Sequence, residues 1–499
     1  MRSRSTTTKS KPSPPLIDGG KTPLVWAPPP PQRWVPHNYQ KKAVRFLLEH
    51  AAAGLLLDPG LGKTSITLAA IKILKREKML DRALIIAPLR PAQLVWPAEQ
   101  RDWLDFNELD MVVLHGDNKE DLLYEDHTIY VMNPEGLPWL MEDNRFKTLD
   151  ADTLVIDELS KFKHTNTRRF KAVKPILGKF ARRWGLTGSP NPNGYLDLFG
   201  QAYMLDMGRS LGKYITYYRT TYFFPTGYGG YTWVLKEGAD KEIQQRLKPL
   251  MLRMDADDYL SLPPLVDNPI YVDLPKKARK VYDQLEEEMF AQLDDERKVT
   301  SINAAAASIK CRQVANGRLY YEDWDANLQQ FAREHAKLHD AKLLAVEDLL
   351  EELQGSPLLL AYHFNHDLEA LQERFGKDLP YIGGGVSTKR AIELERMWNA
   401  GEIPFLAGQP QSIGHGLNLQ KRSNNVGWYG LTWDYELYDQ FIRRVRRQGN
   451  KSSRIFNHLI MARNTMEAGM WEALKDKKHT QQTFLDALNT YRRSRKRFN

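Results

Sequence analysis

The chain has 499 residues, 42% of them hydrophobic, which is enough for two or three domains with cores of their own. Its 71 lysines and arginines against 62 acidic residues leave a formal charge of +9, which suits a polyanionic partner or a merely basic surface. Cys311 is the only cysteine, which excludes intramolecular disulfides and thiolate metal sites. No apolar segment approaches the length of a membrane span. We therefore expect no membrane partner and a place in the cytoplasm, in the host cytoplasm if the gene is viral, or at the nucleoid.

The two ends differ in composition from the body of the chain. Residues 1–31 are rich in Ser, Thr, Lys and Pro, which predicts a disordered basic tail that we extend to residue 34. An organelle transit sequence is the alternative, which the frequent prolines oppose. Residues 481–499 form a basic C-terminal tail that either grips phosphates or is simply solvated.

A glycine-rich turn between a strand and a helix is the strongest signal in the chain. The apolar run 55–57 predicts a buried strand, and residues 65–74 have the apolar spacing of a helix. Backbone amides of such a turn can wrap a polyphosphate, with Lys63 reaching the β- and γ-phosphates and the Thr64 hydroxyl holding magnesium. An ordinary tight turn is the alternative. The predicted nucleotide-binding residues here are Asp58, Pro59, Gly60, Leu61, Gly62, Lys63, Thr64 and Ser65.

An acidic pair follows a later apolar run, 154–156. We expect Asp157 to hold magnesium through its water shell, and Glu158 to orient or deprotonate the attacking water. The alternative is a solvated acidic turn. Upstream, Gln40 opens an apolar helix, and its amide can hydrogen-bond both a donor and an acceptor on adenine. Downstream, residues 187–190 form a polar turn that could couple this site to the rest of the molecule.

Strand-like runs occur in two series, each followed by polar or glycine residues. Because parallel sheets place their ligand sites at the carboxyl ends of strands, the pattern predicts an α/β fold of two lobes with a cleft between them. We assign residues 35–245 to the first lobe and 246–480 to the second. The runs are 55–57, 83–87, 154–156 and 181–186 in the first lobe, and 358–362, 381–384, 405–407 and 426–429 in the second.

Two segments interrupt this alternation. Residues 195–245 hold many aromatics among lysines and arginines, which either stack on bases or pack into a core of their own. Residues 276–353 predict long amphipathic helices inserted in the second lobe. The sequence identifies no protein partner for either segment.

The second lobe also carries an arginine-rich stretch, residues 440–449, which we expect to be helical. Arg444 and Arg447 are three positions apart, so they would share one face. A guanidinium from this lobe could stabilise a transferring γ-phosphoryl group when the cleft closes, and the alternative is a basic face toward solvent or nucleic acid. Ahead of it, Gly416 and Asn418 lie in a glycine-rich segment that can approach a phosphate or a DNA strand.

These strings, in this order, resemble the motor ATPases of helicase superfamily two, and more narrowly the Swi/Snf-type ATPases. The resemblance covers about His37 to Glu467 and is that of a compact bacterial or phage-type member. Further matching strings are residues 86–89 with Trp96 and Glu99, residues 247–253, residues 312–316 and residues 463–467. The resemblance implies two RecA-like parallel-sheet lobes in tandem, with helical insertions, an ATP cleft between the lobes, and ATP and Mg²⁺ as cofactors. It also underlies the adenine contact of Gln40.

The resemblance implies an ATP-driven translocase on DNA, with duplex favoured and single-stranded or forked DNA as further substrates. The alternatives are a strand-separating helicase, an ATP-gated DNA clamp that does not hydrolyse, and an RNA motor. The acidic box reads Asp157-Glu158-Leu159-Ser160 and lacks the family's alanine and histidine. That departure affects the contact between the box and the turn at 187–190. Asn450 and His415 also differ from the family pattern.

Overall fold

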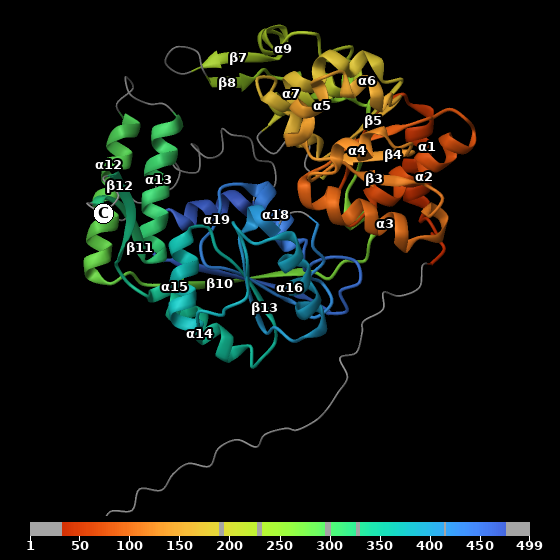
Figure 1. Cartoon of the computed structure of the whole chain (residues 1–499). Coiled ribbons are helices and arrows are strands. Elements are labelled where there is room, and N and C mark those ends of the chain that lie inside the picture. Colours follow the sequence, from red (N-terminus) through yellow and green to blue (C-terminus); the bar gives the residue numbers. More distant parts are fainter. Residues whose placement is uncertain are drawn as a thin grey trace, which may run out of the picture.

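The computed structural model describes residues 32–188, 194–226, 232–294, 301–325, 330–413 and 416–475. Two parallel sheets organise these residues into two lobes, one red to yellow and one green to blue in Figure 1. The first sheet has the order β3-β4-β2-β5-β6-β1-β9, and the second β10-β17-β16-β13-β15-β14. Every pairing in both sheets is parallel, as the alternation of strand-like and helix-like segments predicts. The predicted fold class is confirmed.

The strands of the first sheet are β1 (Ala52–Leu57), β2 (Ala83–Ile86), β3 (Met111–Val113), β4 (Ile129–Met132), β5 (Thr153–Asp157), β6 (Arg182–Thr187) and β9 (Met251–Met254). Those of the second are β10 (Leu265–Val272), β13 (Leu358–Ala361), β14 (Tyr381–Ile382), β15 (Phe405–Gly408), β16 (Asn425–Trp428) and β17 (Ile455–Ala462).

The helices of the first lobe are α1 (Asn38–Glu49), α2 (Lys63–Arg76), α3 (Trp96–Asp102), α4 (Lys119–Tyr124), α5 (Leu137–Met141), α6 (Arg145–Leu149), α7 (Arg168–Val173), α8 (Leu198–Asp206), α9 (Ile215–Tyr222), α10 (Ala239–Leu247) and α11 (Ala256–Tyr259). The helices of the second lobe are α12 (Lys276–Asp294), α13 (Ser301–Asn316), α14 (Ala341–Glu352), α15 (Asn365–Phe375), α16 (Thr388–Ala400), α17 (Pro410–Ile413), α18 (Tyr435–Ile442) and α19 (Glu467–Lys475).

The central strands are buried on both faces, which explains their uninterrupted apolar sequences. In β2, Leu84 and Ile86 contribute to one core cluster, whereas Ala83 and Ile85 contribute to another. Successive side chains of a strand point to opposite faces, so each face of the sheet packs against its own layer of helices. This burial holds the carboxyl ends of the strands in fixed positions at one edge.

The lobe boundary predicted at residues 245 and 246 is wrong by one strand. β9 pairs in parallel with β1 and completes the first sheet, with Gly54 opposite Met251. The second sheet begins only at β10. Strand β9 follows helix α10 directly, and a backbone that must satisfy its hydrogen bonds joins the nearest open sheet edge, which here belongs to β1.

The N-terminal boundary at residue 34 is also too late. Gln32 forms a bridge with Trp103, and the Trp34 amide donates to the Asp105 carboxylate at 2.8 Å. The Trp34 ring packs 5.4 Å from that of Phe106. Residues 32–34 are therefore anchored on the first lobe. The rest of the predicted N-terminal tail and the whole C-terminal tail lie outside the described residues.

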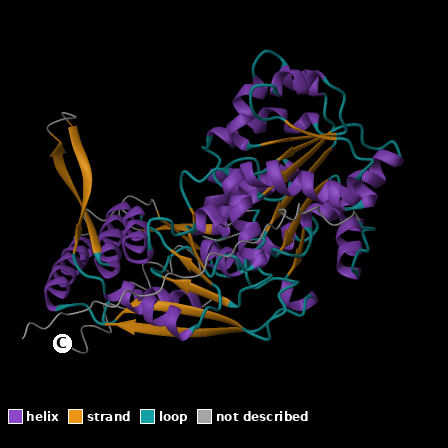
Figure 2. Cartoon of the chain, turned by 60° about the horizontal axis from the view of Figure 1, so that its bottom comes forward, coloured by secondary structure: helices purple, strands orange, loops and turns teal. Residues whose placement is uncertain are grey.

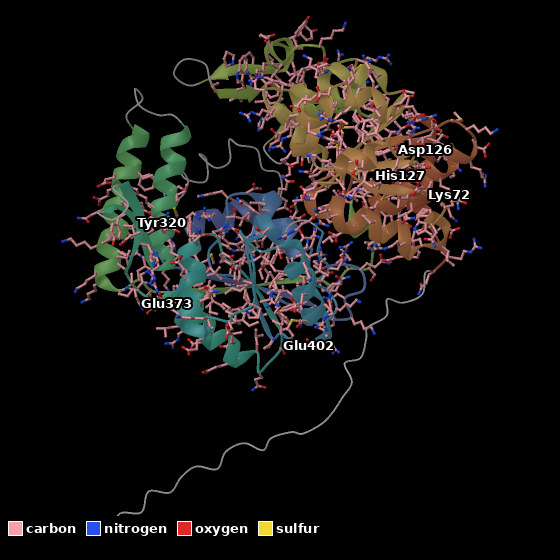
Figure 3. The ribbon with its side chains drawn as sticks, in the orientation of Figure 1. Lys72, Asp126, His127, Tyr320, Glu373 and Glu402 are labelled. Carbon is pink, nitrogen blue, oxygen red and sulfur yellow. The ribbon has the colours of Figure 1, made fainter. Side chains whose placement is uncertain are left out.

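The insertion in the second lobe is not wholly helical. Helices α12 and α13 are followed by a hairpin of β11 (Arg318–Asp325) and β12 (Gln330–Lys337), which extends beside them in Figure 2. The base of the hairpin docks on α15, where the Arg318 guanidinium donates to Glu373 at 3.2 Å and the Tyr320 ring lies 4.6 Å from that of His366 (Figure 3). The sequences of β11 and β12 do not alternate clearly between apolar and polar residues, so hydrophobic periodicity did not predict these strands.

The aromatic-rich segment of the first lobe divides into two groups. Tyr218, Tyr222 and Phe223 are buried and join the core that packs on the first sheet. Tyr214, Tyr217 and others remain exposed. A second hairpin, β7 (Phe223–Thr226) and β8 (Thr232–Leu235), follows α9.

Among the described residues, no helix combines the length and apolar character that crossing a bilayer requires.

Candidate active site at the lobe interface

The glycine-rich turn joins β1 to α2 as predicted, and two of its glycines are required by the backbone. Gly60 has φ 95° and Gly62 has φ 80°, both in the left-handed region that residues with a Cβ rarely adopt. A Cβ on Gly62 would also lie 2.5 Å from the Gln40 amide nitrogen. The turn therefore keeps a shape in which successive amides can face an anion.

Lys63 opens α2, and its ammonium donates to the Leu57 carbonyl at 2.8 Å. Burial lowers the pKa of Lys63, opposed by the charges of nearby carboxylates. Thr64 follows in the same first turn, and the Ser65 hydroxyl donates to Glu99 at 2.7 Å. The lysine thus sits as a partly buried cation beside the turn, with a neutral carbonyl as its hydrogen-bond acceptor.

The acidic pair lies at the carboxyl end of β5, two strands from β1. Asp157 is the last residue of the strand and accepts a hydrogen bond from the Trp96 indole at 3.0 Å. Burial, together with the charge of Glu158, raises the pKa of Asp157 to about 6. Glu158 has φ 61°, a strained conformation for a residue with a Cβ and one that recurs at functional sites.

The acidic pair contacts the polar turn after β6 despite the altered acidic box. Glu158 Oε1 accepts from the Thr187 hydroxyl at 2.9 Å and from the Ser160 hydroxyl at 2.7 Å. Gly188 packs against the glycine-rich turn of residues 58–65, hereafter the P-loop, since a Cβ there would lie 3.0 Å from the Pro59 ring. The Glu158 carboxylate itself therefore contacts the turn at 187–190, although the acidic box lacks the family's histidine.

The arginines do not lie on a helix, which corrects the prediction for residues 440–449. Helix α18 ends at Ile442, and the arginines occupy the turns after it. Four neighbouring cations on regular helical turns would repel one another, whereas these turns direct them to separate partners. Arg444 donates to the carbonyls of Leu417 and Gln440, at 3.1 and 3.2 Å.

Arg444 and Arg447 nevertheless approach the first lobe. Burial lowers the pKa of Arg444 to about 9, assisted by Arg447 and opposed by the charge of Glu395 and, across the interface, by that of Glu158. A Cβ on Gly60 would lie 3.5 Å from Arg447 Cγ and 3.7 Å from its Nε. The structure thus brings both arginines to the same interface as Lys63 and the acidic pair.

The glycine-rich segment of the second lobe lies at this interface too. Gly416 has φ 81°, and a Cβ on it would come within 3.5 to 3.7 Å of Arg90, Pro91 and Val95 of the first lobe. The Asn418 side-chain oxygen accepts a hydrogen bond from Arg447, and the Asn418 backbone amide donates to the Glu395 carboxylate at 3.0 Å. Residues 414 and 415 lie outside the described part of the chain, including His415.

Gln40 packs on the P-loop, not at a distance from it. Its amide nitrogen donates to the Leu61 carbonyl at 3.3 Å, and its oxygen accepts from the His37 amide at 2.9 Å. Gln40 is therefore held against the nucleotide-binding turn. Its predicted contact with adenine stays a prediction.

Two cross-lobe ion pairs among the described residues escaped the sequence analysis. Arg443 pairs with the P-loop residue Asp58 at 3.1 Å and with Asp439 at 2.5 Å. Arg446 pairs with Asp257 at 2.9 Å. A run of arginines signals only positive charge, and the acidic partners are distant in sequence. Only the fold could identify these pairs.

The residues fit a magnesium-bound nucleoside triphosphate. Burial lowers the pKa values of Lys63, Arg444 and Arg447, so three poorly solvated cations converge where an anion would neutralise them. Thr64 and Asp157 supply a hydroxyl and a carboxylate, the hard oxygen ligands that magnesium prefers. A P-loop, an acidic pair and arginines from the opposite lobe define the class of two-lobed P-loop ATPases.

Comparison with known proteins agrees with this class. The family model described as the SNF2-related domain matches residues 39–317, and the chain belongs to the SNF2-related family. Putative protein p41 of Acyrthosiphon pisum secondary endosymbiont phage 1 is 33% identical over 471 residues, which cover 91% of this chain and 99% of that protein. The predicted resemblance to Swi/Snf-type ATPases is confirmed.

More distant relatives are longer proteins. The putative ATP-dependent helicase/translocase YwqA of Bacillus subtilis is 24% identical, with 86% of this chain and 46% of that protein covered. The human SWI/SNF-related matrix-associated actin-dependent regulator of chromatin subfamily A member 1 is 23% identical, with 86% and 42% covered. This chain thus spans less than half of each. The solved Sulfolobus solfataricus SWI2/SNF2 ATPase core in complex with dsDNA matches with a TM-score of 0.42 and 22% identity, over 91% of this chain and 93% of that one.

Proposed function

We propose that this chain is a motor that hydrolyses ATP between its lobes and moves along duplex DNA. The observation that carries the proposal is the convergence of Lys63, from the first lobe, with Arg444 and Arg447, from the second, around one P-loop. A ligand that touches both lobes couples its own hydrolysis to their separation. Membership of the SNF2-related family supports the same activity.

Each residue has a role in this proposal. Lys63 and the P-loop amides hold the β- and γ-phosphates, and Thr64 and Asp157 hold Mg²⁺. The magnesium ion, when bound, neutralises charge on the phosphate oxygens. Glu158 orients the attacking water and accepts its proton, and Arg444 and Arg447 stabilise the charge that develops on the transferring group. Gln40 recognises adenine, and Gly416 and Asn418 position Arg447.

DNA is the proposed track. The basic excess of the chain suits a polyanion, and the Bacillus subtilis relative is named a putative helicase/translocase. A motor that holds the phosphate backbone has weak base preference, and its affinity falls steeply with salt.

We also propose that the protein acts in the cytoplasm, at the nucleoid of the bacterium or host. Imaging of a fluorescent fusion against stained DNA tests this location.

The decisive experiment measures phosphate release from ATP with no nucleic acid, and with duplex, single-stranded and forked DNA and RNA of equal length. We expect the largest stimulation by duplex DNA. Negligible release under every condition contradicts the motor and favours the ATP-gated clamp, provided that ATP still binds. Greater stimulation by RNA favours the RNA motor. Strand displacement on the fork would identify a helicase instead of a translocase.

A further inference from the structure

One stretch of the first lobe concentrates the positive charge of the chain. Residues 159–196 contain nine lysines and arginines and no aspartate or glutamate. The formal charge of the whole chain is also +9, so the rest of the sequence is close to balanced. A local excess of this size marks the surface where a polyanion would bind.

Helix α7 and the 3-10 turn that follows it (Lys174–Lys179) present part of this charge to solvent. Arg168, Lys171 and Lys174 occur at every third position and are all exposed, while Phe170 and Val173 between them are buried in the core. Among the described residues, no carboxylate lies within ion-pair distance of these three cations, although Lys174 lies 5.1 Å from the Tyr203 ring centroid. Their charges are therefore available to an external anion.

Exposed aromatics lie on neighbouring elements of the same lobe. The side chains of Tyr214, Tyr217 and Phe224 are exposed by 72, 60 and 57%. The α8 helix connects α9 to α7 through tilted ring contacts, Phe170 with Tyr203 at 5.8 Å and Phe199 with Tyr218 at 5.4 Å between ring centroids. Figure 1 shows α7, α9 and β7 along one side of the first lobe.

Solvent exposure of three large rings within a short segment calls for a ligand, because each ring loses stabilisation by remaining in water. The Lys236 ammonium lies 5.1 Å from the Phe224 ring centroid, so a cation accompanies the rings as well. Aromatic faces beside unpaired cations are the combination that binds unpaired nucleotides: the rings stack on bases and the cations neutralise phosphates.

We propose that this aromatic–basic surface, made of Arg168, Lys171, Lys174, Tyr214, Tyr217 and Phe224, binds single-stranded DNA beside the motor. In a duplex the faces of the bases are stacked on one another and closed to the tyrosines, so the rings select an unpaired strand. The inference rests on the proposed DNA motor and adds a single-stranded segment as a second binding element, held on a surface separate from the duplex track. A duplex with a single-stranded tail would engage both surfaces.

The test measures the binding of a labelled oligothymidylate and of a labelled duplex of equal length, without ATP, by fluorescence anisotropy. One variant carries Tyr214→Ser, Tyr217→Ser and Phe224→Ser, and a second carries Arg168→Ala, Lys171→Ala and Lys174→Ala. The matched control is Tyr124→Ser, at an exposed tyrosine of α4 in the same lobe. Thermal melting followed by circular dichroism establishes that each variant folds.

We expect the aromatic variant to lose about tenfold or more in affinity for oligothymidylate and little for duplex, since each stacked base contributes roughly 1–3 kcal/mol. The charge variant should lose affinity for both DNAs and show a shallower dependence on salt. Unchanged oligothymidylate binding by either variant, or equal loss of both DNAs in the aromatic variant, overturns the proposal. So does tighter binding of oligouridylate than of oligothymidylate by the wild-type protein. If duplex fails to stimulate ATP hydrolysis while these binding results hold, the proposed motor fails and the surface stands.

Discussion

At the scale of single residues, the site gathers charges that the fold stabilises poorly by itself. Lys63 bonds only a carbonyl in the described structure, and Asp157 carries a pKa raised by burial. Glu158 adopts a left-handed backbone conformation that costs energy of order 1–3 kcal/mol. Such local costs are expected where residues are arranged for a ligand and not for stability.

Lys63→Ala removes the ammonium proposed to hold the β- and γ-phosphates. We expect hydrolysis to fall by at least about a hundredfold, the scale of losing one transition-state donor. Thermal stability should change little, because the buried cation contributes little net stability. Phosphate release and a melting curve measure the two effects. Lys75→Ala on the same helix is the control, since its ion pair with Asp81 is exposed at the surface. Retained hydrolysis in Lys63→Ala would contradict the P-loop assignment.

Asp157→Asn should separate stability from activity. The folded pKa of about 6 exceeds the ordinary value of 3.8, so the folded state holds an extra proton between these two values. The stability contribution of Asp157 therefore falls as the pH rises from about 4 to about 6 and remains low above it. We expect Asp157→Asn to abolish hydrolysis and yet to stabilise the nucleotide-free protein at pH 7 by about 1 to 3 kcal/mol.

Denaturant unfolding at pH 7 and near pH 4 measures this stabilisation, which should shrink at the lower pH, where Asp157 is itself neutral. A gain of the same size at both pH values, or a loss at pH 7, would show that the Asp157 charge does not destabilise the fold.

At the scale of elements, the P-loop and the segment after α18 are tied directly to each other. Arg443 of the second lobe pairs with Asp58 Oδ2, and the same oxygen accepts a hydrogen bond from the Ala256 amide at the start of α11. The side chains of Arg443 and Asp58 are only 12 and 15% exposed. Because Arg443 precedes Arg444 in sequence, we propose that this pair positions the arginines against the nucleotide-binding turn.

A double-mutant cycle on Asp58→Asn and Arg443→Gln tests this positioning role. We expect each single variant to lower kcat more than it weakens ATP binding, because a displaced arginine loses interactions that it makes chiefly in the transition state. The combined effect should be smaller than the sum of the two, since the residues act as one pair. Asp257→Asn is the control, because the Asp257 side chain is 55% exposed and its pair with Arg446 should matter little. Additive effects would show that the pair does not position the arginines.

At the scale of the whole molecule, the proposed catalysis requires the two lobes to meet. Arg447 lies in the second lobe, yet its side chain lies along Gly60 of the first. A group supplied from the opposite lobe contributes to catalysis only while the lobes are closed, which links hydrolysis to their movement.

Arg447→Ala should therefore slow hydrolysis by about a thousandfold, the effect of losing an arginine that stabilises the transferring phosphoryl group, with ATP affinity reduced far less. Phosphate release gives kcat, and titration with a fluorescent ATP analogue gives the affinity. Arg454→Ala, in the second lobe beyond the arginine-rich stretch, is the control. Parallel losses of kcat and affinity would assign Arg447 to ground-state binding.

The parts of the fold that sequence patterns predicted are those in which local signals are strong. The runs at 83–87 and 154–156 are strands because both of their faces are buried, and that burial requires an uninterrupted apolar sequence; the run at 55–57 buries Leu55 and Leu57 fully and Leu56 in part. The strand β10 is half-exposed along its length, and β3 has only three residues, so neither showed a clear pattern. The P-loop and the acidic pair were recognisable because each is a run of residues that are consecutive in the sequence.

The sequence by itself determined the fold class, the glycine-rich turn and the acidic pair, because each depends on interactions among residues close together along the chain. Tertiary structure alone decided that β9 belongs to the first sheet, that the arginines leave the helix, and that Arg443 meets Asp58. The strand pairing joins Gly54 to Met251 and the ion pair joins Asp58 to Arg443, so each depends on residues far apart in the sequence. Hydrogen-bond satisfaction at a sheet edge and charge pairing across an interface depend on distances that only the packed chain defines.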